Sequence, residues 1–185
     1  MRALVVFESM FGNTEKVAGA VARGLQLEGV DTGLVEVHSA PDRLAADLDL
    51  LVVGGPTHAF SMSRASTRAD AVRQGAPSER ATTGLREWLE TVEVDAERAP
   101  GLAAFDTRVT KVRWLPQAAG PSAGRAGKRR GLAPVSKPHG FLVDDIRGPL
   151  VEHELERAVD WGRHLGVELV ERAAATGPVR TPGRD

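Results

Sequence analysis

Ser9 and Thr14 are the hydroxyl residues whose types and spacing are suited to binding chemistry, and a Gly-Asn pair lies between them. The apolar run 3–7 before them predicts a strand buried on both faces. Apolar residues at helical spacing from Val17 to Leu25 predict a helix directly afterwards. A short polar loop between a strand and a helix directs several backbone N–H groups to one point, where the helix N-terminus adds about half a positive charge. We therefore expect the loop to bind a phosphate group.

The loop from Glu8 to Thr14 differs from those that bind nucleoside triphosphates or dinucleotides. It contains neither a Gly-Lys-Ser/Thr run nor a G-x-G-x-x-G pattern. No lysine or arginine lies within it, so neutral donors must hold the anion. This favours a phosphate monoester that the protein holds permanently over one that it hydrolyses. The alternative is an ordinary strand-to-helix turn rich in capping residues.

The same stretch resembles the flavodoxin signature, which requires two aliphatic residues, an aromatic, a hydroxyl, a small residue and a threonine, with an alanine and an aliphatic later. The matching positions are Val5, Val6, Phe7, Ser9, Gly12, Thr14, Ala18 and Val21. The resemblance implies an α/β, flavodoxin-like three-layer sandwich, with a five-stranded parallel sheet in the order 2-1-3-4-5 and helices on both faces. It also implies FMN as the cofactor. The loop residues expected to bind FMN are Ser9, Met10, Phe11, Gly12, Asn13 and Thr14.

Two later loops resemble those that flank the flavin ring in this family. The loop after the predicted strand 50–53 contributes Pro56, Thr57, His58, Ala59 and Phe60, and the turn after the predicted strand 101–105 contributes Phe105, Asp106, Thr107 and Arg108. Many flavodoxins place a Trp or Tyr at the flavin, whereas here Phe60 or His58 would supply the flat surface. For His58, a backbone-bonded loop role is equally open. Packing is the favoured role of Trp114.

The other segments alternate between strands and helices, which predicts a parallel sheet whose ligand lies beyond the carboxyl ends of the strands. A second strand is expected over 32–37, and residues 41–48 form a short connection or helix. Residues 61–77 are long enough for a lid or partner-contact segment. Helices are predicted over 83–94 and 122–131, and the latter is basic.

The C-terminal third predicts a strand and a long helix. The fifth strand, within 132–143, should be an edge strand or a split one because Pro134 and Pro138 interrupt it. The last helix should begin at Gly148-Pro149 and end at Gly177-Pro178.

Composition bounds the remaining possibilities. The 185 residues suit one domain, expected over 1–176 with a flexible tail over 177–185, and 42% are hydrophobic while 26% are charged. No apolar run has the length of a membrane span. The absence of cysteine excludes disulfides and thiolate catalysis, and a cytoplasmic location is expected. The net charge of −1 gives no global field that would recruit nucleic acid.

The function predicted from these features is electron transfer by an FMN-binding flavoprotein, without catalytic residues of its own and without a metal. The alternative is an FMN-dependent oxidoreductase of the same fold, similar to quinone reductases or protoporphyrinogen oxidases, with residues 61–77 over a substrate cleft. A receiver domain is excluded because Gly54 stands where the phosphorylated aspartate would lie. A module without flavin conflicts with the intact signature.

The expected partner is a redox protein, a reductase or an acceptor, and an acidic one fits the basic stretch 108–130. The basic residues of that stretch are Arg108, Lys111, Arg113, Arg125, Lys128, Arg129 and Arg130. Nucleic acid is not expected because no aromatic residues interleave the basic helix.

Overall fold

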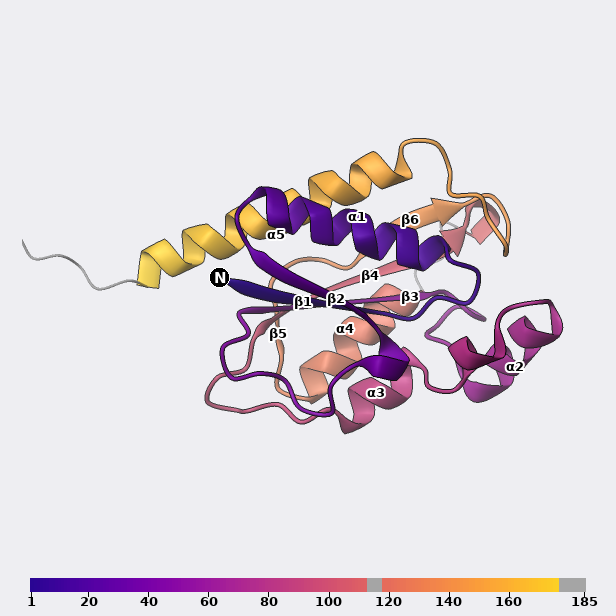
Figure 1. Cartoon of the computed structure of the whole chain (residues 1–185), viewed down its shortest axis with the longest axis horizontal. Coiled ribbons are helices and arrows are strands. Elements are labelled where there is room, and N and C mark those ends of the chain that lie inside the picture. Colours follow the sequence, from indigo (N-terminus) through magenta and orange to yellow (C-terminus); the bar gives the residue numbers. More distant parts are fainter. Residues whose placement is uncertain (113–117, 177–185) are drawn as a thin grey trace, which may run out of the picture.

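The computed structural model of the chain describes residues 1–112 and 118–176. Six strands form one parallel sheet in the order β2-β1-β3-β4-β5, and β6 also pairs with β4 (Figure 1). The strands are β1 (Arg2–Phe7), β2 (Asp31–Glu36), β3 (Leu50–Pro56), β4 (Gly101–Val109), β5 (Ala133–Pro134) and β6 (His139–Val143). The order confirms the predicted flavodoxin-like sheet.

The last position of the sheet is split, as predicted. β5 pairs with the beginning of β4 at Gly101–Leu102, and β6 pairs with its end at Phe105–Val109. Residues 135–138 connect the two strands, and Pro134 and Pro138 on either side cannot donate a backbone N–H to the ladder. The proline spacing therefore interrupts the edge of the sheet at a defined place.

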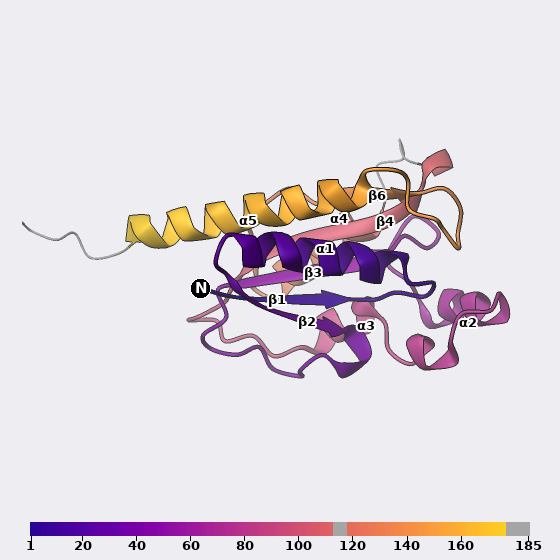
Figure 2. The same ribbon diagram turned by 45° about the horizontal axis from the view of Figure 1, so that its top comes forward.

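Helices cover both faces of the sheet. α1 (Asn13–Leu27) and α5 (Glu154–Thr176) lie on one face, and α3 (Leu85–Thr91) and α4 (Ala119–Arg129) lie on the other (Figures 1 and 2). The remaining α-helix, α2 (Ala65–Arg73), lies beyond the carboxyl ends of the strands (Figure 2). Short 3₁₀ turns span Val37–Ser39, Ser78–Ala81 and Thr110–Val112. α1 and α5 approach closely, since a Cβ on Gly24 would lie 2.2 Å from the Val159 carbonyl oxygen.

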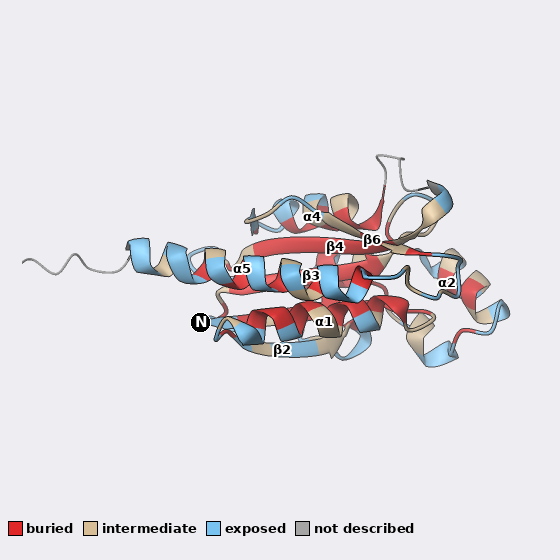
Figure 3. Cartoon of the chain, turned by 90° about the horizontal axis from the view of Figure 1, so that it is seen from above, coloured by how far each residue is buried: buried red, intermediate tan, exposed pale blue. Residues whose placement is uncertain are grey.

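Two apolar cores result because successive strand residues point to opposite faces. Val5 and Phe7 of β1 pack with the α1 and α5 side, whereas Val6 packs with Leu85 and Leu89 on the α3 side. The central strands are therefore buried over most of their length, as Figure 3 shows for β3 and β4. This burial explains why their sequences read as continuous apolar runs.

The structure corrects several predicted element boundaries. Of the two alternatives for 41–48, the connection is observed and the helix is not, whereas 61–77 contain α2 rather than only a loop. α5 begins at Glu154 instead of Gly148-Pro149, because Leu150 first bridges back to Val143 at the sheet edge. The predicted end at Gly177-Pro178 and the tail fall outside the described residues. Across 1–112 and 118–176, no helix combines the length and apolar character needed to cross a membrane.

Candidate functional site

A cavity of about 280 Å³ opens at the carboxyl ends of β1, β3 and β4, between the N-terminus of α1 and helix α2. Its lining comes from five separate parts of the chain: Ser9, Met10, Phe11, Asn13, Thr14, Pro56, Thr57, His58, Ala59, Thr67, Asp70, Ala71, Gln74, Thr107, Arg108, Val109, Val143 and Ile146. This is the edge at which parallel α/β sheets bind ligands.

The loop between β1 and α1 is held in a shape that presents hydrogen-bond donors. Gly12 has a φ of 85°, which a side chain would disfavour. The Ser9 hydroxyl oxygen accepts hydrogen bonds from the backbone N–H groups of Gly12, at 3.1 Å, and Glu15, at 3.3 Å. Because that oxygen only accepts in these bonds, its own proton is free to point into the cavity.

Four backbone N–H groups of this loop, those of Met10, Phe11, Asn13 and Thr14, donate to no atom within the described residues. All four residues line the cavity. Unsatisfied N–H groups at a helix N-terminus form an anion site because each requires an acceptor and the helix dipole favours negative charge. A phosphate group carries acceptor oxygens and negative charge of the kind that such a site requires.

Thr107, which the sequence assigned to the turn beside the flavin ring, also contacts the loop between β1 and α1. Its hydroxyl lies 2.8 Å from the hydroxyl of Thr14, and both residues are buried. One proton suffices for the bond between them, which leaves the other to donate to a ligand. The pair joins the end of β4 to the first turn of α1, so two of the predicted binding segments meet at one point.

Two arginines that the local sequence pattern did not indicate lie next to the loop. Arg80 donates to the carbonyl oxygen of Ser9 at 3.3 Å and pairs with Glu15 at 2.8 Å. Arg147, from the connection between β6 and α5, donates to the carbonyl oxygen of Gln74 and lies 6.0 Å from the centre of the Phe11 ring. Arg147 therefore links this connection to the C-terminal end of α2 across one wall of the cavity.

The loop after β3 forms a tight turn at its tip. His58 and Ser61 exchange backbone hydrogen bonds of 2.9 and 3.0 Å. Ala59 and Phe60 have positive φ values of 45° and 65°, a conformation that costs energy in residues other than glycine and is concentrated at functional sites. Phe60 is 46% exposed and does not line the cavity, whereas His58 does. Burial, with the charge of Arg68, lowers the pKa of His58, so the ring is neutral at pH 7.

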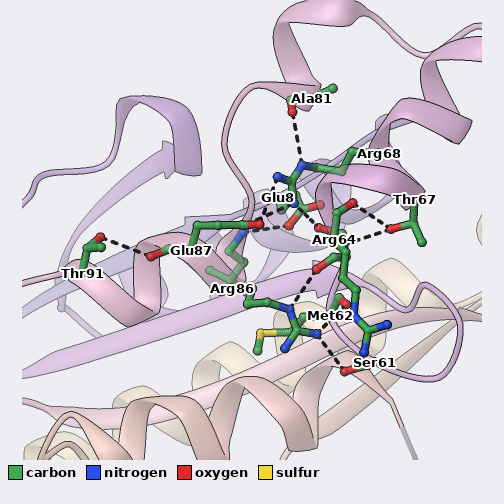
Figure 4. Close-up of polar contacts among 12 residues, drawn as sticks. Glu8, Ser61, Met62, Arg64, Thr67, Arg68, Ala81, Arg86, Glu87 and Thr91 are labelled. Carbon is green, nitrogen blue, oxygen red and sulfur yellow. Dashed lines mark hydrogen bonds and ion pairs between the residues drawn. The ribbon is translucent and has the colours of Figure 1, made fainter.

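Arginines also anchor this loop and α2 to the body of the protein (Figure 4). Arg68 of α2 is 3% exposed and donates to the Ser63 hydroxyl, the Ala81 carbonyl and both carboxylate oxygens of Glu87. Burial alone would raise the pKa of Glu87, but hydrogen bonds and charge from Arg68 bring it below its usual value. α2 is therefore fixed beside the cavity by a charged network.

Arg86 of α3 holds the loop itself. Its guanidinium donates to the hydroxyl of Ser61 at 3.1 Å and to the carbonyl oxygens of Met62 and Ser63 at 2.9 and 3.1 Å (Figure 4). These bonds fix the segment directly after the turn, so the position of His58 is set by a residue far along the chain.

Beneath this network lies Glu8, the last residue before the phosphate loop. It is 1% exposed, and one of its carboxylate oxygens accepts from the backbone N–H of Leu85 at 2.8 Å. Burial raises the pKa of Glu8, against the hydrogen bond from Leu85 and the charge of Arg68. Glu8 therefore caps α3 rather than facing the cavity.

The turn after β4 is divided between the cavity and the core. Phe105 packs against Phe141 and Trp161, with ring centres 6.0 and 6.1 Å away, and does not line the cavity. Asp106 is fully buried and accepts from Arg108 Nε at 2.6 Å and from the backbone N–H of Gly120 at 3.0 Å. Phe105 and Asp106 lie deeper along β4, in the core on the α5 side and against Gly120 of α4 respectively, whereas Thr107 and Arg108 nearer the end of the strand line the cavity.

Eleven of the fifteen predicted binding residues line the cavity together, and the exceptions are Gly12, Phe60, Phe105 and Asp106. Arg108 reaches the cavity wall with its charge paired to Asp106. Arg113 and Trp114 lie outside the described residues. The lining residues that the sequence did not indicate are Thr67, Asp70, Ala71, Gln74, Val109, Val143 and Ile146. No local pattern marks them, because only the tertiary fold brings α2 and the end of β6 to this edge.

The comparisons with known proteins agree with this geometry. The family profile of flavodoxin matches residues 5–95, which include the phosphate loop and the loop after β3. A flavodoxin from the domain Archaea is similar in structure, with a TM-score of 0.59 and 15% identity over 92% of this chain and 99% of that chain. The flavodoxin of Streptococcus pneumoniae TIGR4 gives a TM-score of 0.60 and 19% identity over 93% of this chain and 99% of that chain.

A larger protein contains the same unit. The flavodiiron protein of Giardia intestinalis matches with a TM-score of 0.60 and 20% identity, over 96% of this chain and only 38% of that chain. No curated protein matches this chain in sequence.

The sheet order defines a parallel α/β fold, and the loop at its carboxyl edge presents backbone N–H groups without acceptors among the described residues. The fold is flavodoxin-like, and residues 5–95 match the flavodoxin family, which supports FMN as the cofactor. The residues present fit that cofactor, because uncharged donors surround a space at the anion-binding end of α1.

Proposed function

We propose that the chain binds FMN in the cavity at the carboxyl ends of β1, β3 and β4 and acts as an electron carrier between other redox proteins. The observation that carries this proposal is the set of unsatisfied N–H groups at Met10, Phe11, Asn13 and Thr14. Bound FMN supplies the redox chemistry, whereas the protein supplies position and electrostatics.

Each part of the cavity has a distinct role in this proposal. The four N–H groups and the hydroxyls of Ser9 and Thr14 hold the phosphate, and Thr107 orients Thr14. Thr57, His58 and Ala59 lie along the side where the ring system would rest. Arg147 closes the wall next to Phe11 and restrains the chain segments around the site.

A carrier needs no general acid or base, and the titratable side chains of the cavity suit that role. They are His58, Asp70 and Arg108. Arg108 is paired with Asp106, and Asp70 is paired with Arg73. His58 is kept neutral by burial and by the charge of Arg68. None of these three is arranged with a nucleophile or a second base, so the electron-carrier role fits best.

The test is the visible absorption spectrum of protein purified without added cofactor, followed by chromatography of the released flavin. We expect a yellow protein that releases FMN rather than FAD, because the loop offers one phosphate site. A colourless protein that takes up no FMN on titration would overturn the proposal.

The second candidate is an FMN-dependent oxidoreductase, and the position of α2 is the observation that favours it. Thr67, Asp70 and Gln74 of this helix line the cavity opposite the phosphate loop, where a substrate would approach. Steady-state oxidation of NADH or NADPH with a soluble quinone distinguishes the two. An enzyme would show saturable turnover that Asp70→Asn and Gln74→Ala reduce, whereas a carrier would show only slow, unsaturated reaction.

A further inference from the structure

A second surface of the protein combines an apolar groove with a basic rim. The groove has a volume of about 260 Å³ and lies between α4 and the split edge of the sheet. Its lining consists of Leu102, Ala104, Pro121, Gly124, Arg125, Lys128, Pro134, Ser136 and Pro138, and we call it the α4 groove. Figure 3 shows α4 beside β4, with its outer side exposed.

The groove exists because the fifth strand is interrupted. Between β5 and β6, residues 135–138 leave the line of the sheet, so a strand no longer covers that side of β4. Leu102 and Ala104 form an apolar floor, and three prolines form stiff walls. Gly124 keeps the groove open, because a Cβ there would already lie 3.7 Å from Pro138 Cγ and 4.0 Å from Ala104 Cβ.

The rim of the α4 groove carries uncompensated positive charge. Arg125, Lys128, Arg129 and Lys137 are exposed, and within the described residues none of them pairs with a carboxylate. Elsewhere among the described residues, exposed arginines such as Arg43 and Arg163 are paired with carboxylates, those of Glu93 and Glu28. A cluster of unpaired cations around an apolar groove has to be screened by solvent, salt or a partner.

The groove is also connected to the cofactor cavity. Ser61, at the end of the turn that carries His58, donates to the Ser122 hydroxyl of α4 at 3.3 Å. One turn further along the helix, Arg125 donates to the same hydroxyl at 3.2 Å. A protein seated on the groove would therefore lie against the loop that borders the cavity.

We propose that the α4 groove docks an acidic protein partner, through a surface segment in which acidic side chains flank an apolar one. The apolar side chain enters between the prolines, and its acidic neighbours meet Arg125, Lys128 and Lys137. Nucleic acid fits less well, because no aromatic side chain lines the groove to stack on a base. That the partner is a redox protein rests on the proposed electron-carrier function. The groove and its positive charge are features of the structure and are independent of that function.

The test uses the full chain, labelled with ¹⁵N, and the peptide Glu-Glu-Leu-Glu-Glu with blocked ends as the probe. We expect amide shifts at Gly124, Ser136 and their neighbours, and about tenfold weaker binding when Arg125→Glu and Lys128→Glu are combined, since each exposed ion pair contributes up to about 1 kcal/mol. The matched control combines Arg23→Glu with Arg98→Glu, which changes the net charge equally at exposed arginines elsewhere.

Gly124→Leu tests the apolar part without changing charge. It should fill the groove and weaken binding of this peptide, with little effect on binding of Glu-Glu-Gly-Glu-Glu. Equal affinities for the Arg125/Lys128 variant and its control would overturn the proposal. It is also overturned if oligothymidylate or phosphatidylserine vesicles displace the peptide and shift the same amides at lower concentration. FMN is titrated into the same samples. Samples that bind FMN but not the peptide contradict the docking proposal alone, whereas samples that bind no FMN contradict the proposed function.

Discussion

The cavity at the carboxyl edge of the sheet contrasts with a larger one at the opposite edge. The larger cavity measures about 780 Å³ and lies between β1, β2, the connection 41–48 and residues 93–95. It exists because no α-helix covers this side of β2, so Leu4 and Val35 remain only partly buried. Its size is nearly three times that of the cofactor cavity at 280 Å³.

The two cavities differ in what their walls offer a ligand. Charged groups around the larger cavity satisfy one another, as Arg2 does with Asp47 at 2.9 Å and Arg43 with Glu93 at 2.5 Å. The smaller cavity instead presents backbone N–H groups without acceptors and the hydroxyls of Ser9, Thr14 and Thr107. Unsatisfied donors, not volume, therefore mark the site, because they are the groups that gain free energy from a ligand.

The difference in hydrogen-bond donors between the two cavities is tested by two variants, each of which removes one hydroxyl from one cavity. Ser9→Ala deletes a donor to the phosphate and the acceptor that holds the Gly12 and Glu15 N–H groups, so FMN affinity should fall by about 1.5–3 kcal/mol. Flavin fluorescence quenching measures the affinity. Thr32→Val, in the larger cavity, is the control and should leave it unchanged. Equal effects of both variants would contradict the assignment.

Thr14 gives a related comparison within the cofactor cavity. From the sequence alone, Thr14→Ala is expected to weaken FMN binding more than Ser9→Ala, because Thr14 lies in the first helical turn. The contacts of these residues lead us to expect the opposite order. Thr107 retains a hydroxyl beside the site when Thr14 is removed, whereas nothing among the described residues replaces Ser9. We expect Thr14→Val to weaken FMN binding by about 1 kcal/mol and Thr14→Val with Thr107→Val to weaken it further. A larger loss from Thr14→Val than from Ser9→Ala would contradict this order.

Arg147 tests whether the wall of the cavity restrains the ligand. Arg147→Gln removes the contact with Phe11 and the charge-assisted bond to Gln74, and we expect FMN to dissociate about fivefold faster, which corresponds to about 1 kcal/mol. Stopped-flow release into excess apoflavodoxin measures the rate. Arg98→Gln, in the turn after Asp95 of the larger cavity, is the matched control. An unchanged rate for Arg147→Gln would mean that the wall does not retain the ligand.

Glu8, which caps α3 next to the loop between β1 and α1, gives a test by pH dependence. Its pKa in the folded protein lies above the ordinary value of 4.5, so the folded state binds more protons, and stability falls as pH rises from about 4.5 through the folded pKa. Glu8→Gln should remove this fall and be the more stable protein above that range, while the Leu85 N–H keeps an acceptor. Urea unfolding across a pH series measures it. The exposed Glu93→Gln is the control, and an identical pH profile for both variants would contradict the effect of burial.

The smallest expected effect lies in the larger cavity. Gly33 is an exposed strand residue there, and the nearest atom to a Cβ would be Cδ1 of the flexible Leu4 side chain, at 3.2 Å, followed by the Ala3 carbonyl oxygen at 4.0 Å. Gly33→Val should raise the free energy of unfolding by about 0.5–1 kcal/mol, because glycine weakens a strand. FMN affinity should not change. A loss of FMN binding would show that the two cavities communicate, contrary to the comparison above.

The sequence by itself determined the sheet and the loop between β1 and α1. Short apolar runs at 3–7, 50–53 and 101–105 read as buried parallel strands because both faces of those strands are covered by helices. The loop could be predicted because the conformation of Gly12 and the hydrogen bonds of Ser9 involve only neighbouring backbone atoms. Such features depend on local sequence spacing. The prolines likewise marked the split strand, since a missing N–H is a local property.

Only the tertiary structure decided which distant residues complete the site. The register of β4 against β3 placed Phe105 and Asp106 inside the core and brought Thr107, two residues further along the strand, to Thr14. The sequence did not predict α2, because its segment is polar. Its buried residue Arg68 is held by Ser63 and Glu87, which lie outside the helix. Arg80 and Arg147 reach the loop from far along the chain. Contacts between residues widely separated in sequence have no local signature, and chain packing alone creates them.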